Sequence, residues 1–125
     1  SISAYFAESN IIHCMSHDSS IILQFPLHYQ GLVKPVVRGS DDFYPRKPAS
    51  HGTHLYANAF NALMLAHCGA LQDWDMFQTN LGDVGAMHAA SRSISGGPVY
   101  VSDSPGDHNV ELLKKVAFED GGVPR

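Results

Sequence analysis

Short apolar runs that stop abruptly at polar side chains recur along the chain, and helical patterns lie between them. The runs expected to form strands are Ile11–Met15, Val36–Arg38, a segment near Leu71, and Pro98–Val101. An alternation of strands and helices is typical of a parallel sheet with covering helices. The pattern therefore predicts an α/β protein built from four strand–helix units.

Apolar residues at helical spacing predict the covering helices. The expected helices are residues 1–10, His51–His67 with Ser50 as its N-cap, Asp83–Ser93, and Asn109–Ala117 with Val110, Leu113 and Val116 facing inward. The segment Ile21–Val33 is apolar but contains Pro26 and Gly31, so it is expected to be irregular.

Polar groups follow every predicted strand. They are His17 and Asp18 after the first, Arg38, Asp41 and Asp42 after the second, Asp73 and Asp75 after the third, and Ser102 and Asp103 after the fourth. An isolated Ser-Asp-Asp is typical of a turn or helix cap. In a (β/α)₈ barrel, however, the carboxyl ends of all strands share one face, where the active site lies. The repetition predicts that these groups converge, and four units amount to half of such a barrel.

Composition and charge exclude several classes of protein. The 125 residues suit one domain or part of one, and a hydrophobic fraction of 44% is that of a globular protein. A net charge of −4 without a basic cluster argues against nucleic-acid and membrane-surface partners. Cys14 and Cys68 lack metal or redox spacing and are expected to be buried thiols, which fits a reducing, cytoplasmic location. The oligomeric state stays open.

The carboxylates suggest glycoside hydrolysis, which uses one protonated acid and one ionised carboxylate around the scissile bond. The candidates are Asp41, Asp42, Asp73, Asp75 and Asp103. Trp74, Phe43 and Tyr44 could stack on a sugar face, although a lone Trp is as often half-buried core. Arg38 could hold one acid or a substrate hydroxyl.

Two other chemistries are less well supported by the sequence. A metal-dependent hydrolase would use histidines, and His51 and His54 share a helix face, but no HExxH or His-x-His at a strand end occurs. His67 and His88 are expected to be helix-packed residues. The glycines at Ser95–Pro98 precede a strand, whereas phosphate loops follow one, so a helix stop is the better interpretation. No metal or other cofactor is expected.

Three stretches together resemble the raffinose synthase and seed imbibition protein family, the α-galactosidase-like members of glycoside hydrolase family 36. They are Val37–Arg46, Asp73–Phe77 and Ile94–Asp103, with further similarity at Cys14–His17 and His108–Lys115. The resemblance covers nearly the whole chain in the same order, and Ile21–Pro35 departs from it.

The resemblance implies a retaining mechanism in a (β/α)₈ barrel, with two aspartates, no metal, and an α-galactoside as substrate. The family's Arg-x-x-x-Asp pattern falls on Arg38 and Asp42, which makes Asp42 the expected acid/base and Asp41 its rival. The Asp-Met pattern of substrate contacts falls on Asp75 and Met76, with Trp74 lining the same pocket. Asp73, His17 and Asp103 are further substrate-binding candidates.

The family nucleophile belongs to a Lys-x-Asp motif that this sequence lacks. The chain is therefore expected to correspond to about strands five to eight of the barrel, without the nucleophile and inactive alone. Hydrolysis and galactosyl transfer stay open, because both begin with the same half-reaction. A non-catalytic carbohydrate-binding or regulatory half-barrel is the alternative.

Overall fold

Three short strands form one parallel sheet in the computed structural model, which describes residues 5–6, 10–28 and 34–124. The strands are β1 (Ile12–His13), β2 (Val36–Arg38) and β3 (Leu71–Asp73), in the spatial order β1-β2-β3. Beyond β3 the chain continues to Phe77, which makes an isolated parallel bridge with Val101. The fourth predicted strand segment therefore also runs parallel to the third.

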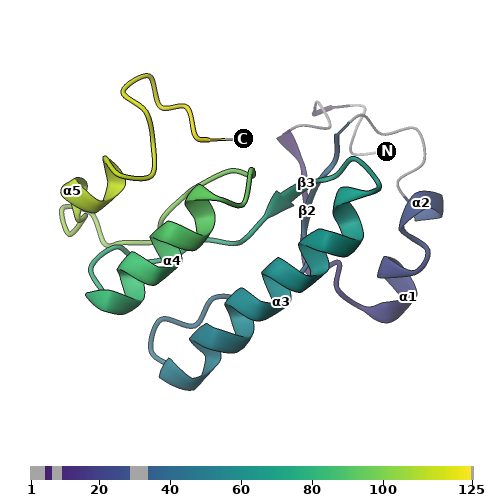
Figure 1. Cartoon of the computed structure of the whole chain (residues 1–125), viewed down its shortest axis with the longest axis horizontal. Helices are drawn as coiled ribbons and strands as arrows, with labels where there is room; N and C mark the ends of the chain where they lie inside the picture. Colours follow the sequence, from purple (N-terminus) through teal and green to yellow (C-terminus); the bar gives the residue numbers. More distant parts are fainter. Residues whose placement is uncertain (1–4, 7–9, 29–33, 125) are drawn as a thin grey trace.

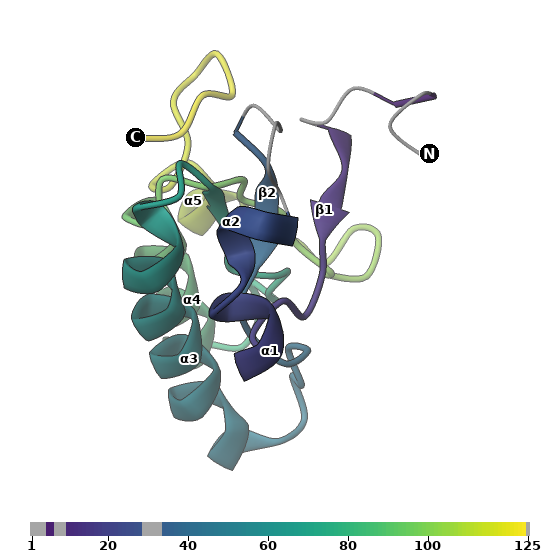
Figure 2. The ribbon, with the colours of Figure 1, turned by 90° about the vertical axis from the view of Figure 1, so that its right-hand side faces the viewer.

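Helices follow the parallel segments along the chain. They are α1 (Ser19–Ile22), α2 (Phe25–His28), α3 (Pro48–Ala66), α4 (Asp83–Ser93) and α5 (Val110–Leu113). The two long helices, α3 and α4, lie side by side (Figure 1) and on the same side of the sheet (Figure 2). Each long helix thus leads from one parallel segment to the next, as in βαβ units.

The side of β2 that packs on helices is set by Val37. This residue is fully buried in a cluster with Phe25 of α2 and Leu65 of α3. Successive side chains of a strand point to opposite faces, so Val36 and Arg38 point away from that cluster. A second cluster joins Phe43, Phe77, Ala89 and Val116 under α4 and α5. Because Val37 faces the helices, Arg38 points to the opposite face of β2, at the carboxyl end of the strand.

The helix predictions are confirmed for α4 and partly wrong for α3. Helix α3 begins at Pro48, with Lys47 at the N-cap and no side-chain cap bond. Proline is suited to the first helical turn because the missing N–H has no acceptor there anyway. Ser50 is consequently inside the helix, and its hydroxyl donates to the Lys47 carbonyl at 2.7 Å.

Other differences from the prediction concern short segments. Part of the segment expected to be irregular forms the single-turn helices α1 and α2. The strand expected at Pro98–Val101 is reduced to the Val101 bridge, since Pro98 has no N–H to donate to a ladder. Helix α5 is shorter than expected, and Val110 is 53% exposed rather than inward. The helix predicted for residues 1–10 lies mostly outside the described residues.

The cysteine prediction is also wrong. Cys14 and Cys68 are free thiols and both are exposed. Cys14 follows β1 in a turn, and Cys68 lies in the turn after α3, so neither is carried into a core by its element. His67 is exposed for the same reason as Cys68, whereas His88 is fully buried as expected. Among the described helices, none is both long and apolar enough to cross a bilayer.

Candidate active site

The guanidinium of Arg38 joins two of the predicted site carboxylates. Its Nη2 donates to Oδ1 of Asp42 at 2.6 Å, and its Nη1 lies 2.9 Å from Oδ1 of Asp75. Burial acts to lower the pKa of Arg38, but its two carboxylate partners outweigh burial and raise the pKa above its usual value. The Arg38 and Asp75 side chains are 6% and 2% exposed, whereas the Asp42 side chain is 57% exposed. Arg38 is thus a buried cation that holds one buried and one accessible carboxylate.

Both carboxylate oxygens of Asp75 are bonded to protein donors. Its Oδ2 accepts from the Phe43 backbone N–H at 2.7 Å, and its Oδ1 accepts from the Met76 N–H at 2.8 Å as well as from Arg38. Its backbone has φ +65°, in the left-handed region that non-glycine residues rarely occupy. Because Asp75 bonds the loop after β2 from the loop after β3, it ties two strand ends together.

Asp73 occupies the end of β3 as a buried acceptor. It is the register partner of Arg38, is 1% exposed, and accepts from the Asp75 N–H and from the Tyr100 hydroxyl, both at 2.9 Å. Burial raises the pKa of Asp73, and the bond from Tyr100 only partly offsets this. Burial also raises the pKa of Tyr100, which therefore stays a hydroxyl donor.

Asp41 lies at the surface beside the first strand end. Its side chain is 73% exposed, and Oδ1 is 3.4 Å from Nε2 of His17, which follows β1. A pocket of about 190 Å³ is lined by Asp41, Asp42, Tyr44, Ser50, Thr53, His54 and Ala57. Both candidate acids therefore open into the same small pocket, between the β2 loop and the first turns of α3.

Asp103 belongs to a different group of contacts. Its two oxygens accept from the backbone and hydroxyl of Thr79, at 2.7 and 2.8 Å, and His108 Nδ1 is 3.3 Å away. Burial acts to raise the pKa of Asp103, but the bonds from Thr79 and His108 outweigh it and hold the pKa below its usual range. The structure does not bring Asp103 into contact with Arg38. Asp103 instead joins the loop after β3 to the loop after Val101.

The aromatic residues near the site are mostly covered. Trp74 is 8% exposed, and its indole Nε1 is buried with no hydrogen-bond partner among the described residues. Phe43 is also 8% exposed, with its ring against His51, His54 and His88, so it does not offer a face to a sugar. Met76 is 39% exposed and is the open member of the Trp74–Met76 loop.

Comparison with known proteins covers the whole chain, including the residues of this site. The sequence model of the family described as raffinose synthase or seed imbibition protein Sip1 matches residues 1–125. The chain belongs to the raffinose synthase family. A probable galactinol–sucrose galactosyltransferase 6 of Arabidopsis thaliana is 42% identical over the whole chain. The galactinol–sucrose galactosyltransferase of Pisum sativum is 35% identical over the whole chain, and its stachyose synthase is 38% identical over 70% of it.

The chain spans only a small part of these relatives. It covers 16% of the length of the two Arabidopsis proteins that are 42% identical to it. The 42% identity extends over all 125 residues, so the site described above lies within the aligned region.

A second polar network of this raffinose synthase family chain is not predicted by the sequence pattern. Arg92 of α4 is 1% exposed and reaches the loop that carries Trp74, Asp75 and Met76. His54 of α3 and His88 of the preceding turn of α4 lie against Arg92, and His51 of α3 contacts His88. The i, i+3 spacing of the α3 histidines and the i, i+4 spacing of His88 and Arg92 were the available signals. Neither spacing reveals that the two helices face each other.

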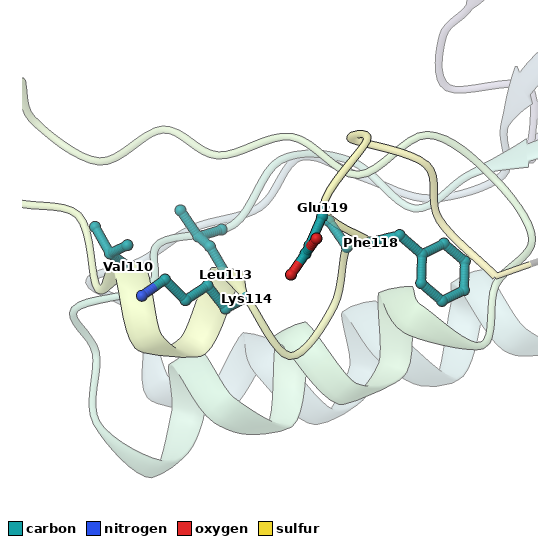
Figure 3. A pocket seen from close by; sticks show the side chains of 6 residues that line it. Val110, Leu113, Lys114, Phe118 and Glu119 are labelled. Carbon is teal, nitrogen blue, oxygen red and sulfur yellow. The ribbon is translucent and has the colours of Figure 1, made fainter.

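Another pocket of the chain does not resemble the Arg38 site. A pocket of about 520 Å³ beside α5 is lined by Val110, Leu113, Lys114, Ala117, Phe118 and Glu119, none of which is a predicted site residue (Figure 3). Within residues 5–6, 10–28 and 34–124, no three His, Cys, Asp or Glu side chains are grouped so that they could hold a metal ion.

Proposed function

We propose that this chain forms the carboxyl-terminal half of a (β/α)₈ barrel that transfers galactose from an α-galactoside to another sugar. Membership of the raffinose synthase family supports the substrate class, and the relatives named galactinol–sucrose galactosyltransferase support transfer. The parallel order β1-β2-β3, followed by the Phe77–Val101 bridge, is the sequential neighbour order of such a barrel. The observation that carries the proposal is the Arg38 fork between buried Asp75 and accessible Asp42.

The reaction proposed is a double displacement with retention. Asp42 protonates the leaving-group oxygen while a carboxylate outside these 125 residues attacks the anomeric carbon and displaces that oxygen. Asp42, now ionised, then takes the proton of an acceptor hydroxyl, whose oxygen displaces the carboxylate and forms the new α-galactosidic bond. Such a pair of carboxyl groups should lie ~5–5.5 Å apart.

Asp42 is preferred over Asp41 because of how each is held. Catalytic groups must be kept close to one geometry by neighbours that are themselves fixed. Asp42 is bonded at 2.6 Å to a buried guanidinium that Asp75 holds from the other side. Among the described residues, Asp41 has a single side-chain partner, His17, at 3.4 Å, and the His17 side chain is itself 29% exposed. We assign Asp41 and His17 to the rim of the pocket, where they can contact substrate hydroxyls.

The remaining predicted residues divide by exposure. Met76 is open enough to touch a sugar, whereas the indole N–H of Trp74 is buried and has no partner among the described residues. Asp73 and Asp75 have their oxygens occupied by protein donors, which favours positioning roles for both. Asp103 would act from outside the Arg38 group by holding the neighbouring loop.

The test uses the full-length protein that carries this sequence, with galactinol as donor and either sucrose or water as acceptor. Asp42→Asn should lower kcat/KM for galactinol by about 10²–10⁴-fold, the usual contribution of general acid catalysis. The same variant should lose little kcat/KM on α-galactosyl fluoride, whose leaving group needs no proton. Added azide should give the Asp42→Asn variant an α-galactosyl azide product, which reports retention.

Two variants provide the comparison. Asp41→Asn should retain most of its activity on both donors. Glu111→Gln makes the same chemical change at a side chain that is 80% exposed and should behave as wild type. If Asp42→Asn turns over galactinol normally, the acid/base assignment is refuted. If the wild-type protein releases galactose to water and never to sucrose, transfer is refuted and hydrolysis takes its place.

A further inference from the structure

Arg92 is a buried cation that binds backbone rather than a carboxylate. Its Nε donates to the Asp75 carbonyl at 2.8 Å, and its Nη2 donates to the carbonyls of Trp74 and Met76 at 2.6 and 3.1 Å. Its side chain is among the largest fully buried ones of the described residues. Burial lowers the pKa of Arg92 to about 10. A buried charge without a directly bonded counterion is costly, so a hydrophobic residue would suit stability alone at least as well.

His88 contacts Nη1 of the guanidinium, and His51 in turn contacts His88. An arginine can only donate, so Nδ1 of His88, 2.9 Å from Nη1 of Arg92, accepts and its ring proton lies on Nε2. That Nε2 in turn donates to Nδ1 of His51, 2.8 Å away on α3. Burial lowers the pKa of His88 to about 3, consistent with a neutral ring. The guanidinium is therefore oriented by a chain of hydrogen bonds that begins on a neighbouring helix.

The three carbonyls that Arg92 holds belong to the loop from which the candidate acid is positioned. Asp75, the middle residue, has the left-handed backbone and pairs with Arg38, which bonds Asp42. We propose that Arg92 is a positioning residue for the acid/base Asp42, acting through the backbone of residues 74–76, the Asp75 carboxylate and the Arg38 guanidinium. The inference rests on the function proposed above and adds a residue that touches neither substrate nor Asp42.

The mechanism of positioning is the curvature of the loop. Three carbonyls that converge on one planar donor set fix the direction of the Asp75 side chain, since its φ of +65° is otherwise unfavourable. Lysine offers donors at a single point and lacks the planar fork, so it cannot reproduce the arrangement. Loss of Arg92 should let Asp75 relax, turn Arg38 and leave Asp42 misplaced. A misplacement of about 1 Å can cost about 10²-fold in rate.

The experiment compares two donors in the full-length protein. The ratio of kcat/KM for galactinol to kcat/KM for α-galactosyl fluoride does not depend on how much of a sample is folded. A merely structural role lowers both values equally, whereas misplacement of the acid lowers the galactinol value alone. Arg92→Lys should reduce the ratio by about tenfold or more, a part of the full contribution of general acid catalysis. Lys115→Met, which removes an exposed cation, should leave the ratio unchanged.

A milder variant covers the case in which Arg92→Lys does not fold. His88→Gln removes the imidazole that orients Nη1 but keeps the guanidinium, and should lower the ratio in the same direction by a smaller factor. In the double variant Arg92→Lys with Asp42→Asn, the two effects on the ratio should not multiply, because both act on one proton transfer.

The outcomes separate the two proposals. An unchanged ratio in Arg92→Lys and in His88→Gln, with a reduced ratio in Asp42→Asn, overturns the positioning role and leaves the proposed function standing. An unchanged ratio in Asp42→Asn overturns the proposed function, and the role of Arg92 falls with it. Multiplying effects in the double variant also overturn the route through Asp42.

Discussion

Replacing Asp75 by asparagine tests whether its carboxylate ties the two strand ends together. The substitution keeps the shape of the side chain, and asparagine tolerates the left-handed backbone as well as aspartate does. Both carboxylate oxygens, however, face donors: Phe43 N–H on Oδ2, and Met76 N–H with Arg38 Nη1 on Oδ1. An amide must turn its NH₂ group toward one of these sides. Either orientation of the new amide in Asp75→Asn therefore opposes a donor with a donor.

The magnitude follows from burial. Asp75 is 2% exposed, so water cannot replace the lost acceptor. One unsatisfied buried donor costs about 1–3 kcal/mol, and removing one partner of a buried ion pair costs about 3–5 kcal/mol. These two costs overlap at Arg38, so we expect Asp75→Asn to lower the free energy of local opening by about 3–4 kcal/mol. At about 1.4 kcal/mol for each tenfold change, exchange at the bonded amides should accelerate by about 10²-fold or more.

Hydrogen–deuterium exchange of the full-length protein measures this directly at the Phe43 and Met76 amides. Asp41→Asn is the matched control, since its side chain is 73% exposed and its one partner among the described residues is His17 at 3.4 Å. Exposed pairs contribute about 0–1 kcal/mol, so the control should change exchange at those amides by less than about fivefold. An acceleration below about threefold in Asp75→Asn at both amides would refute the reasoning.

Three other changes probe the surroundings of the site. Gly97→Ala should sharply lower the thermal midpoint, because a Cβ there would lie 1.6 Å from a backbone carbonyl oxygen of β3, whereas Gly52→Ala meets nothing within 4 Å and should be neutral or stabilising. Tyr100→Phe leaves a buried oxygen of Asp73 without its donor and should cost about 1–3 kcal/mol in denaturant unfolding; a loss below about 0.5 kcal/mol contradicts this. The pKa of His88 is about 3 against an unfolded value of 6.5, so the unfolded state binds the proton more readily between these values. The contribution of His88 to the free energy of unfolding should therefore be complete above pH 6.5. It should fall as the pH drops toward 3, by up to about 1.4 kcal/mol per pH unit, and the pH profile of unfolding should be flatter in His88→Gln.

The elements that the sequence predicts well are those with strong local signals. Helix α4 has the predicted bounds, Asp83–Ser93, because a helical stripe leads into the Gly96-Gly97 break. The strand Val36–Arg38 has the predicted bounds too, since a β-branched run ends at a charge. The predicted start of α3 is wrong because Ser50 has the character of a cap, while Pro48 two residues earlier already supplies the helical φ.

The site could be predicted only where it depends on strand ends. Parallel strands bring their carboxyl ends to one edge, so the meeting of Arg38, Asp42 and Asp75 follows from strand order. The contacts of Arg92 instead join α4 to a loop 16 to 18 residues earlier in the chain, through its Nε and Nη atoms. They depend on how α3 and α4 pack, and nothing in the local pattern states that packing. A buried arginine is also rare enough that a solvated one is the natural expectation.

Several features that break local rules in this chain meet at one place. Asp75 has a strained backbone, Arg38 and Arg92 are buried charges, and Trp74 has a buried N–H without a partner among the described residues. Each is unfavourable alone, and such exceptions persist only where surrounding contacts over-determine them. Here two guanidinium groups hold one three-residue loop from its backbone and from its side chain. The cost of that arrangement is explained if the accessible Asp42 carboxylate, at the end of the chain of contacts, needs a fixed position.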